Sequence, residues 1–168
     1  MKTIQAKRRL GANGPELSSL GLGCMGMSDF YGPAEEAESI ATIQTALEAG
    51  ITLLDTGDFY GMGRNELLLR EALKGGKRDR VFLQVKFGAQ RDPAGAFIGY
   101  DARPAAVKTA LAYSLTRLGT DTGDPPPAEA PHQPPALEVR AAALREVKPP
   151  PVLVLDSANV SEVNRDPR

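Results

Sequence analysis

Residues 49–61 read Ala-Gly-Ile-Thr-Leu-Leu-Asp-Thr-Gly-Asp-Phe-Tyr-Gly, and they give the main evidence for the fold class. Its apolar run is closed by Asp55, and Tyr60 follows in a glycine-rich loop. A second apolar run, Val81–Val85, is closed by Lys86. Short apolar runs separated by a helical pattern are typical of buried parallel strands. We therefore expect Asp55, Tyr60 and Lys86 to meet at the carboxyl-end rim of a parallel sheet, where α/β folds build their sites.

An acid, a phenol and an amine at one rim have a shared chemical use. A phenol is a weak proton donor, since its ordinary pKa is about 10. A neighbouring ammonium eases the loss of that proton, and a carboxylate beside the ammonium keeps it charged. The residue types at this rim therefore predict a general acid, Tyr60, assisted by Lys86 and Asp55.

The first 121 residues repeat a strand–helix pattern. Strands are expected at residues 20–23, 51–55 and 81–86, and helices at 33–49, 65–73 and 104–118. A hairpin built on Asn13-Gly14 precedes them. The helical segments have apolar residues at helical spacing and are followed by glycine. Alternating strands and helices form the βα repeat of a parallel sheet, so the expected fold class is α/β.

Three stretches resemble the aldo-keto reductases: Gly21-Leu-Gly-Cys-Met-Gly-Met-Ser28, Ala49 to Gly61, and Gln84-Val-Lys-Phe-Gly88. The resemblance covers residues 3–121. It implies a TIM barrel and an oxidoreductase that transfers a hydride from NADPH to an aldehyde or ketone, a small-molecule carbonyl substrate. It also implies a catalytic tetrad of Asp, Tyr, Lys and His.

Carried onto this sequence, the resemblance implies Tyr60 as proton donor, with Asp55 and Lys86 as two further members of the tetrad. Gly23 and Asp55 would contact the nicotinamide end of the cofactor. The fourth member would be His132, the single histidine, because His132-Gln133-Pro134 fits the family's local pattern. The neighbouring prolines favour the alternative that His132 is a solvated loop residue.

Length and composition predict an incomplete barrel. A (β/α)₈ barrel typically needs about 250 residues, whereas this sequence has 168. Residues 1–121 would be the N-terminal portion of such a barrel, the bottom hairpin and three βα units. Residues 122–168 are proline-rich and are expected to be poorly ordered. Weak echoes of later barrel elements are a helix pattern at 136–148 and a strand at 152–156.

The incomplete barrel makes activity doubtful and leaves two functions open. The first is a carbonyl reductase that binds NADPH weakly, because the family's phosphate and adenosine contacts come from its last barrel loops. The second is a non-catalytic truncated remnant or pseudoenzyme. The substrate, the choice between NADPH and NADH, and the oligomeric state stay open.

Charge and composition exclude several other classes. The sequence has 20 basic and 21 acidic residues and a net charge of −1, so it has no electrostatic case for binding nucleic acid or an anionic membrane. Its single cysteine, Cys24, fits a reducing compartment. It has no apolar signal region and no spanning run of about 18 apolar residues. We expect a cytoplasmic protein with no metal site.

Three motifs have a competing interpretation. Gly21-Leu-Gly-Cys-Met-Gly26 spells the dinucleotide fingerprint of a Rossmann fold, but Asp55 lies 29 residues past Gly26 and that fingerprint needs an acid about 20 residues on. The stretch Leu53 to Gly57 resembles an aspartic-protease strand, yet helical patterns flank it. The basic cluster Lys74 to Arg80 is more typical of a solvated loop than of a phosphate site.

Overall fold

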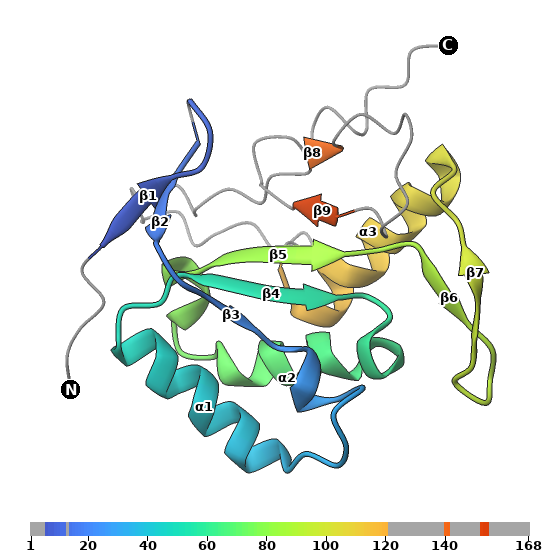
Figure 1. The fold of residues 1–168 in the computed structure, drawn as a ribbon, viewed down its shortest axis with the longest axis horizontal. Helices are drawn as coiled ribbons and strands as arrows, with labels where there is room; N and C mark the ends of the chain where they lie inside the picture. Colours follow the sequence, from blue (N-terminus) through green and yellow to red (C-terminus); the bar gives the residue numbers. More distant parts are fainter. Residues whose placement is uncertain (1–5, 13, 121–139, 142–151, 155–168) are drawn as a thin grey trace, which may run out of the picture.

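The computed structural model describes residues 6–12, 14–120, 140–141 and 152–154 (Figure 1). At its centre lies a sheet in the order β3-β4-β5-β9-β8, where β9 is Val152–Val154 and β8 is Arg140–Ala141. Three of these strands are parallel: β3 (Gly21–Gly23), β4 (Leu53–Gly57) and β5 (Phe82–Lys86). Figure 1 shows the helices α1 (Glu36–Glu48) and α2 (Arg64–Ala72) on one face of this sheet. The third helix, α3 (Pro104–Leu118), packs against α2.

The order β3-α1-β4-α2-β5-α3 confirms the expected α/β fold and the βα repeat of a partial barrel. Helix α3 has the bounds predicted from sequence. Strand β4 begins two residues later than expected because Gly50 (φ 94°) ends α1 and the Ile51 amide donates to the Ala46 carbonyl, 3.0 Å away. Ile51 therefore completes the helix end rather than starting the strand.

The core lies between the sheet and the helices. Side chains alternate between the two faces of a strand, and Leu54, Leu83 and Val85 point toward the helices, with at most 1% of each exposed. They join one hydrophobic cluster with residues of all three helices, among them Ile43, Leu69 and Leu111. The opposite face of β4 and β5 carries Asp55 and Lys86. The alternation thus keeps the polar groups out of the core.

Two hairpins flank the sheet. The expected N-terminal hairpin is present as β1 (Lys7–Arg9) and β2 (Glu16–Ser18), paired antiparallel. Ser18 and Thr52 exchange hydrogen bonds of 2.8 and 2.9 Å, which attach this hairpin to the start of β4. The second hairpin, β6 (Ala89–Arg91) and β7 (Phe97–Tyr100), was not predicted. The loops also contain three short 3-10 helices, η1 (Met25–Met27), η2 (Tyr60–Gly63) and η3 (Lys77–Arg80).

The downstream strands correct the sequence-based expectation. Val152–Val154 forms a strand, β9, as expected, but it runs antiparallel beside β5, whereas barrel strands are parallel. The helix expected at 136–148 is wrong at Arg140–Ala141, which form β8 and pair with β9. Without β9 the N–H and C=O groups on this edge of β5 would lack strand partners, and a β-prone Val-Leu-Val segment can pair with them in either direction.

The remaining expectations for residues 122–168, including their poor order and the position of His132, lie outside the described residues. Within the described ranges no helix is long and apolar enough to cross a membrane.

The packing of α2 against the sheet generates the first prediction. Leu69 is fully buried, whereas Leu67, two positions earlier in the same helix, is 45% exposed. Leu69→Ala should lower the free energy of unfolding by about 2–5 kcal/mol, because it removes buried methyl groups and leaves a cavity. Leu67→Ala, the matched control, should change it by less than about 0.5 kcal/mol. Urea denaturation followed by circular dichroism measures both; equal losses would contradict the described packing.

Candidate functional site

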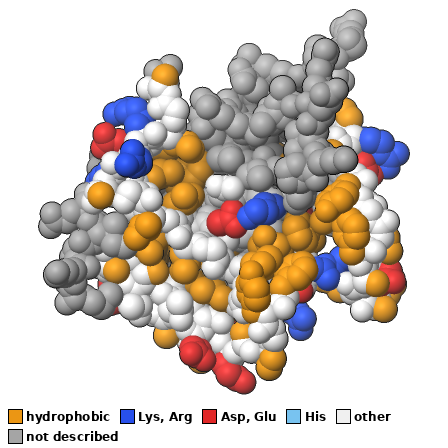
Figure 2. Space-filling model, viewed as in Figure 1, with side chains coloured by type: hydrophobic (Ala, Val, Ile, Leu, Met, Phe, Trp, Pro, Cys, Tyr) orange, Lys and Arg blue, Asp and Glu red, His pale blue; other side chains and the backbone are white. Residues whose placement is uncertain are grey.

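Asp55 and Lys86 form an ion pair on the open face of the sheet. Asp55 is the third residue of β4 and pairs in register with Gly23 of β3, while Lys86 is the last residue of β5. The Lys86 ammonium donates a hydrogen bond to Oδ1 of Asp55, and each side chain is about a quarter exposed, 23% and 26%. Figure 2 shows an acidic and a basic side chain in contact at the centre of the viewed face, with hydrophobic side chains around them. The pair is therefore partly shielded from water.

Tyr60 lies beside this ion pair. It begins η2, is 4% exposed, and has its ring centroid 5.7 Å from the Lys86 Nζ. The ring packs edge-to-face against Phe59, with centroids 4.8 Å apart. A Cβ at Gly57 would lie 3.2 Å from the ring, so the absence of a side chain there lets Tyr60 lie close to the end of β4. The structure thus brings together three of the four residues predicted as a tetrad; His132 lies outside the described residues.

Asn65, in the first turn of α2, connects the loop after β3 to strand β4 through hydrogen bonds. It is fully buried, and its Nδ2 donates to the Cys24 carbonyl (2.8 Å) and to Ser28 Oγ (2.7 Å). Its Oδ1 accepts a hydrogen bond of 2.6 Å from Thr56. A buried amide with all these partners holds its neighbours in one arrangement. Sequence reasoning missed Asn65, because an Asn in the first turn of a helix gives no sign of partners 37 and 41 positions earlier.

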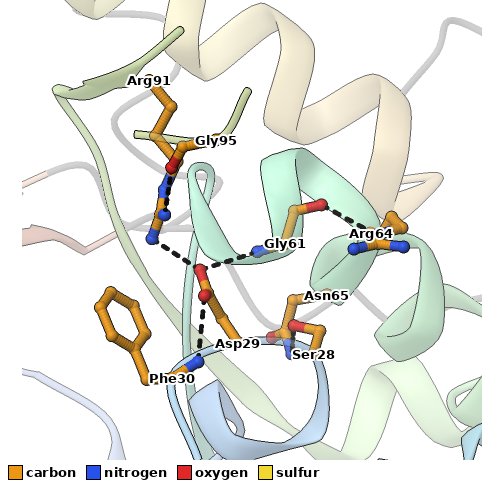
Figure 3. Close-up of polar contacts among 8 residues, drawn as sticks. All are labelled: Ser28, Asp29, Phe30, Gly61, Arg64, Asn65, Arg91 and Gly95. Carbon is orange, nitrogen blue, oxygen red and sulfur yellow. Dashed lines mark hydrogen bonds and ion pairs between the residues drawn. The ribbon is translucent and has the colours of Figure 1, made fainter. Parts of the chain in front are cut away.

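Asp29 connects three loops around the site (Figure 3). Its Oδ2 accepts hydrogen bonds from the Gly61 amide (3.1 Å) and from Arg91 Nη2 (2.7 Å), and its Oδ1 accepts one from the Phe30 amide (3.0 Å). Arg91 also donates from Nη1 to the Gly95 carbonyl, 2.8 Å away. These contacts attach the loop after β3 to the η2 loop and to the β6–β7 hairpin. Sequence reasoning missed both Asp29 and Arg91.

A pocket of about 380 Å³ opens beside Tyr60 and Lys86. Its other lining residues are Met25, Phe30, Phe59, Ala89, Arg91, Phe97 and Tyr100. Two further hollows of similar volume contain neither Tyr60 nor Lys86. The pocket next to the acid, phenol and amine is therefore the candidate site.

The space beside Asp55 suits a bound group. Gly23 lies next to Asp55 in the sheet, and a Cβ added to Gly23 would meet no atom of the described chain within 4 Å. A ligand can thus approach the backbone at the carboxyl end of β3. No three His, Cys, Asp or Glu side chains in the described ranges come close enough to hold a metal ion.

Cys24 is a neutral thiol. It is fully buried, and burial, together with the nearby charge of Asp55, raises its pKa to about 12. Because the thiolate is the reactive form of cysteine, Cys24 is no nucleophile at neutral pH.

Asp58 is the most perturbed carboxyl group near the site. Its Oδ1 is buried and has no hydrogen-bonding partner among the described atoms. Burial, and then the charge of Glu66, raise its pKa to about 7, although Arg117 opposes this shift. Glu66 is itself fully buried and paired with Arg117, which joins α2 to α3.

The structure does not support the three competing interpretations, which were a Rossmann fingerprint, an aspartic-protease strand and a phosphate site. After the glycines of residues 21–26 the chain forms η1 and a loop, and α1 begins only at Glu36, whereas the Rossmann fingerprint opens directly into a helix. Asp55 lies in a parallel strand between helices rather than in β-rich surroundings. Residues 77–80 of the basic cluster form η3, and Lys74 and Arg80 are exposed, as expected for a solvated loop.

Comparisons with known proteins agree with the geometry. A family model described as "Aldo/keto reductase family" matches residues 19–131. The chain is 36% identical over 107 residues to "Aldo-keto reductase yakc [NADP(+)]" of Schizosaccharomyces pombe. The matched region covers 63% of this chain and 32% of that protein. The chain thus spans about a third of the length of this curated relative.

Solved structures of aldo-keto reductases also resemble this chain. The holo form of aldo-keto reductase AKR11C1 from Bacillus halodurans is similar, with a TM-score of 0.59 and 36% identity, over 68% of this chain and 37% of that one. The putative aldo-keto reductase PA4992 from Pseudomonas aeruginosa has a TM-score of 0.62 and 30% identity, over 71% of this chain and 45% of that one. The chain spans less than half of each.

The raised pKa of Asp58 predicts a pH-dependent stability. An ordinary Asp ionises near pH 4, whereas Asp58 in the folded chain ionises at about pH 7. Between these values the folded chain holds a proton that the unfolded chain has released, so the free energy of unfolding falls as the pH rises. Asp58→Asn should remove this fall and be more stable than the unsubstituted chain at pH 8. The gain should be on the order of 2 kcal/mol, because one pKa unit corresponds to about 1.4 kcal/mol and partial exposure reduces the effect.

Asp101→Asn is the control for this measurement. Hydrogen bonds from Arg103 lower the pKa of Asp101 to about 2, so its stabilising contribution is present above pH 4 and is lost only as the pH falls toward 2. Urea titrations from pH 4 to pH 8 should therefore show the same fall in the free energy of unfolding for Asp101→Asn as for the unsubstituted chain. An unchanged slope in Asp58→Asn would contradict the assignment.

Proposed function

This chain belongs to the aldo-keto reductase family, and we propose that it reduces the carbonyl group of an aldehyde or ketone with NADPH. The observation that carries the proposal is the Asp55–Lys86 ion pair, which lies 5.7 Å from the ring centroid of the buried Tyr60 at the edge of one pocket. Since the chain spans about a third of its curated relative, the activity and substrate class of the whole reductase are part of the proposal.

The proposed reaction adds a hydride to carbon and a proton to oxygen. NADPH, when bound, supplies the hydride to the carbonyl carbon. Tyr60 donates its phenolic proton to the carbonyl oxygen, which yields the alcohol and leaves a phenolate. The charge of Lys86 stabilises that phenolate, and the ion pair with Asp55 holds the ammonium in place. Water then returns a proton to Tyr60.

Cofactor contacts are proposed for the same edge of the sheet. Gly23 and Asp55 would face the nicotinamide end of NADPH, which is supported by the open space next to the Gly23 backbone. We propose His132 as the candidate fourth member of the tetrad, where its imidazole would orient the carbonyl oxygen.

A non-catalytic role is the second candidate, and one observation favours it. Strand β9 occupies the edge of β5 in the antiparallel direction, where a parallel barrel strand would continue the sheet. Loss of NADPH absorbance in the presence of an aldehyde separates the two candidates, because a non-catalytic chain should oxidise no NADPH even where it binds the cofactor.

The role of Tyr60 generates a direct test. Tyr60→Phe keeps the ring that packs against Phe59 and removes the only proton that the side chain can donate. If Tyr60 is the general acid, kcat for an aldehyde should fall by about 10² or more. The dissociation constant of NADPH should change little, because the hydroxyl acts mainly on the transition state.

Tyr31→Phe makes the same chemical change in the neighbouring loop, where the side chain is 78% exposed. It should leave kcat unchanged, as followed by the loss of NADPH absorbance. If kcat falls in Tyr31→Phe and is unchanged in Tyr60→Phe, the proposed acid is the wrong tyrosine.

A further inference from the structure

We propose that Asp29 and Arg91 are positioning residues that make the pocket beside Tyr60 selective for a carbonyl compound bearing an uncharged aromatic group. This inference rests on the proposed function, since it names the substrate class of the same pocket. It comes from the composition of the pocket walls, the pairing of its charges, and the contacts that hold the walls together.

The walls of the pocket are aromatic. Phe59 and Tyr60 line it, and the rings of Phe30 and Tyr60 are edge-to-face with centroids 6.3 Å apart. The β7 strand supplies Phe97 and Tyr100, whose rings are 4.8 Å apart and which are 56% and 59% exposed. Exposed rings of this kind can pack edge-to-face or offset against an added aromatic ring. A volume of about 380 Å³ is within the range of small-molecule sites.

The charges that line the pocket are already paired. Lys86 is bonded to Asp55, and Arg91 is bonded to Asp29 at 2.7 Å. An anionic substrate group would have to compete with these carboxylates, and a cationic group would face two fixed cations. Burying an unpaired charge is costly. The pocket therefore favours an uncharged group.

One carboxylate holds the walls of the pocket together. Asp29, 18% exposed, binds Arg91 of β6, 17% exposed, and also accepts the Gly61 amide next to Tyr60. The Arg91 guanidinium lies 5.1 Å from the ring centroid of Phe30 and donates to Gly95 in the hairpin turn. Breaking such a largely buried pair leaves an uncompensated charge, so the hairpin wall keeps its place only while the pair is intact.

The backbone of Phe30 gives independent support. Phe30 has φ 65°, in the left-handed region that a bulky residue rarely adopts. Strain of this kind persists only where the surroundings impose it, and it gathers at ligand sites. The Asp29 Oδ1 accepts the Phe30 amide at 3.0 Å, so the same carboxylate holds the Phe30 ring opposite Tyr60.

The test uses the full 168-residue chain and two aldehydes that share the naphthalene ring and differ in one carboxylate, 2-naphthaldehyde and 6-formyl-2-naphthoate. Amide chemical shifts in NMR titrations give a dissociation constant for each. In the unsubstituted chain 2-naphthaldehyde should bind more tightly and shift the amides of Phe30, Tyr60 and the β7 strand. In Asp29→Asn the Arg91 charge loses its partner, so the preference for the uncharged aldehyde should fall by about fivefold or more, as expected for a released charge pair.

Asp101→Asn is the matched control, because it releases Arg103, whose side chain is 84% exposed, from an ion pair with a carboxylate that does not line this pocket. It should leave both dissociation constants unchanged. A second variant, Arg91→Lys, keeps the charge but lacks the planar fork that reaches Asp29 and Gly95 together. Arg91→Lys should raise the dissociation constant of 2-naphthaldehyde by about threefold or more, the size expected when one coupled contact is lost.

Three results would overturn the inference: no shift of the β7 amides with 2-naphthaldehyde, an unchanged preference in Asp29→Asn, or equal changes in Asp29→Asn and Asp101→Asn. If Asp29 had only a structural role, Asp29→Asn would weaken the binding of both aldehydes by the same factor and leave the ratio of their dissociation constants unchanged. Failure of the proposed function is a separate observation, because it requires that no aldehyde be reduced with NADPH while the binding preference and its dependence on Asp29 persist.

Discussion

The parallel register of β3, β4 and β5 determines which side chains of these strands enter the core and which reach the candidate site. It pairs Gly23 with Asp55 and Gly57 with Lys86, so that one open edge carries the ion pair and the space beside it. A slip by one residue would turn every side chain of a strand to the other face. Asp55 would then enter the core and Leu54, now fully buried, would face the pocket. The apolar contacts of the helices thus indirectly determine where the polar chemistry lies.

Buried polar side chains outside the sheet extend this order into the loops. Asn65 joins α2 to β4 and to the loop after β3, and Asp29 joins that loop to the η2 loop and the β6–β7 hairpin. Loops at the edge of a parallel sheet have few apolar contacts of their own, so hydrogen bonds to buried groups determine their conformation. A site assembled in this way is only as rigid as these few polar contacts.

Sequence patterns predicted what depends on local periodicity. Helix α3 has its expected bounds because Pro104 and Gly119 mark its two ends. Asp55 and Lys86 could be placed at one edge because each closes an apolar run. The Asp29–Arg91 pair could not be predicted, since its members lie 62 residues apart and each resembles a solvated surface residue. The β6–β7 hairpin had a signal, the turn residues Asp92 to Gly95, but its strands alternate too irregularly to stand out. The direction of β9 depends on the free edge of β5, which no local pattern records.

The burial of Cys24 has a practical consequence. A thiol that stays protonated and out of contact with water reacts slowly with alkylating reagents and mild oxidants. Because Cys24 is the only cysteine in the sequence and is fully buried, the folded chain has no competing thiol on its surface. A single cysteine introduced on the exposed β6–β7 hairpin could therefore carry a fluorophore or spin label without replacement of the native residue, and it would report the mobility of the hairpin in solution.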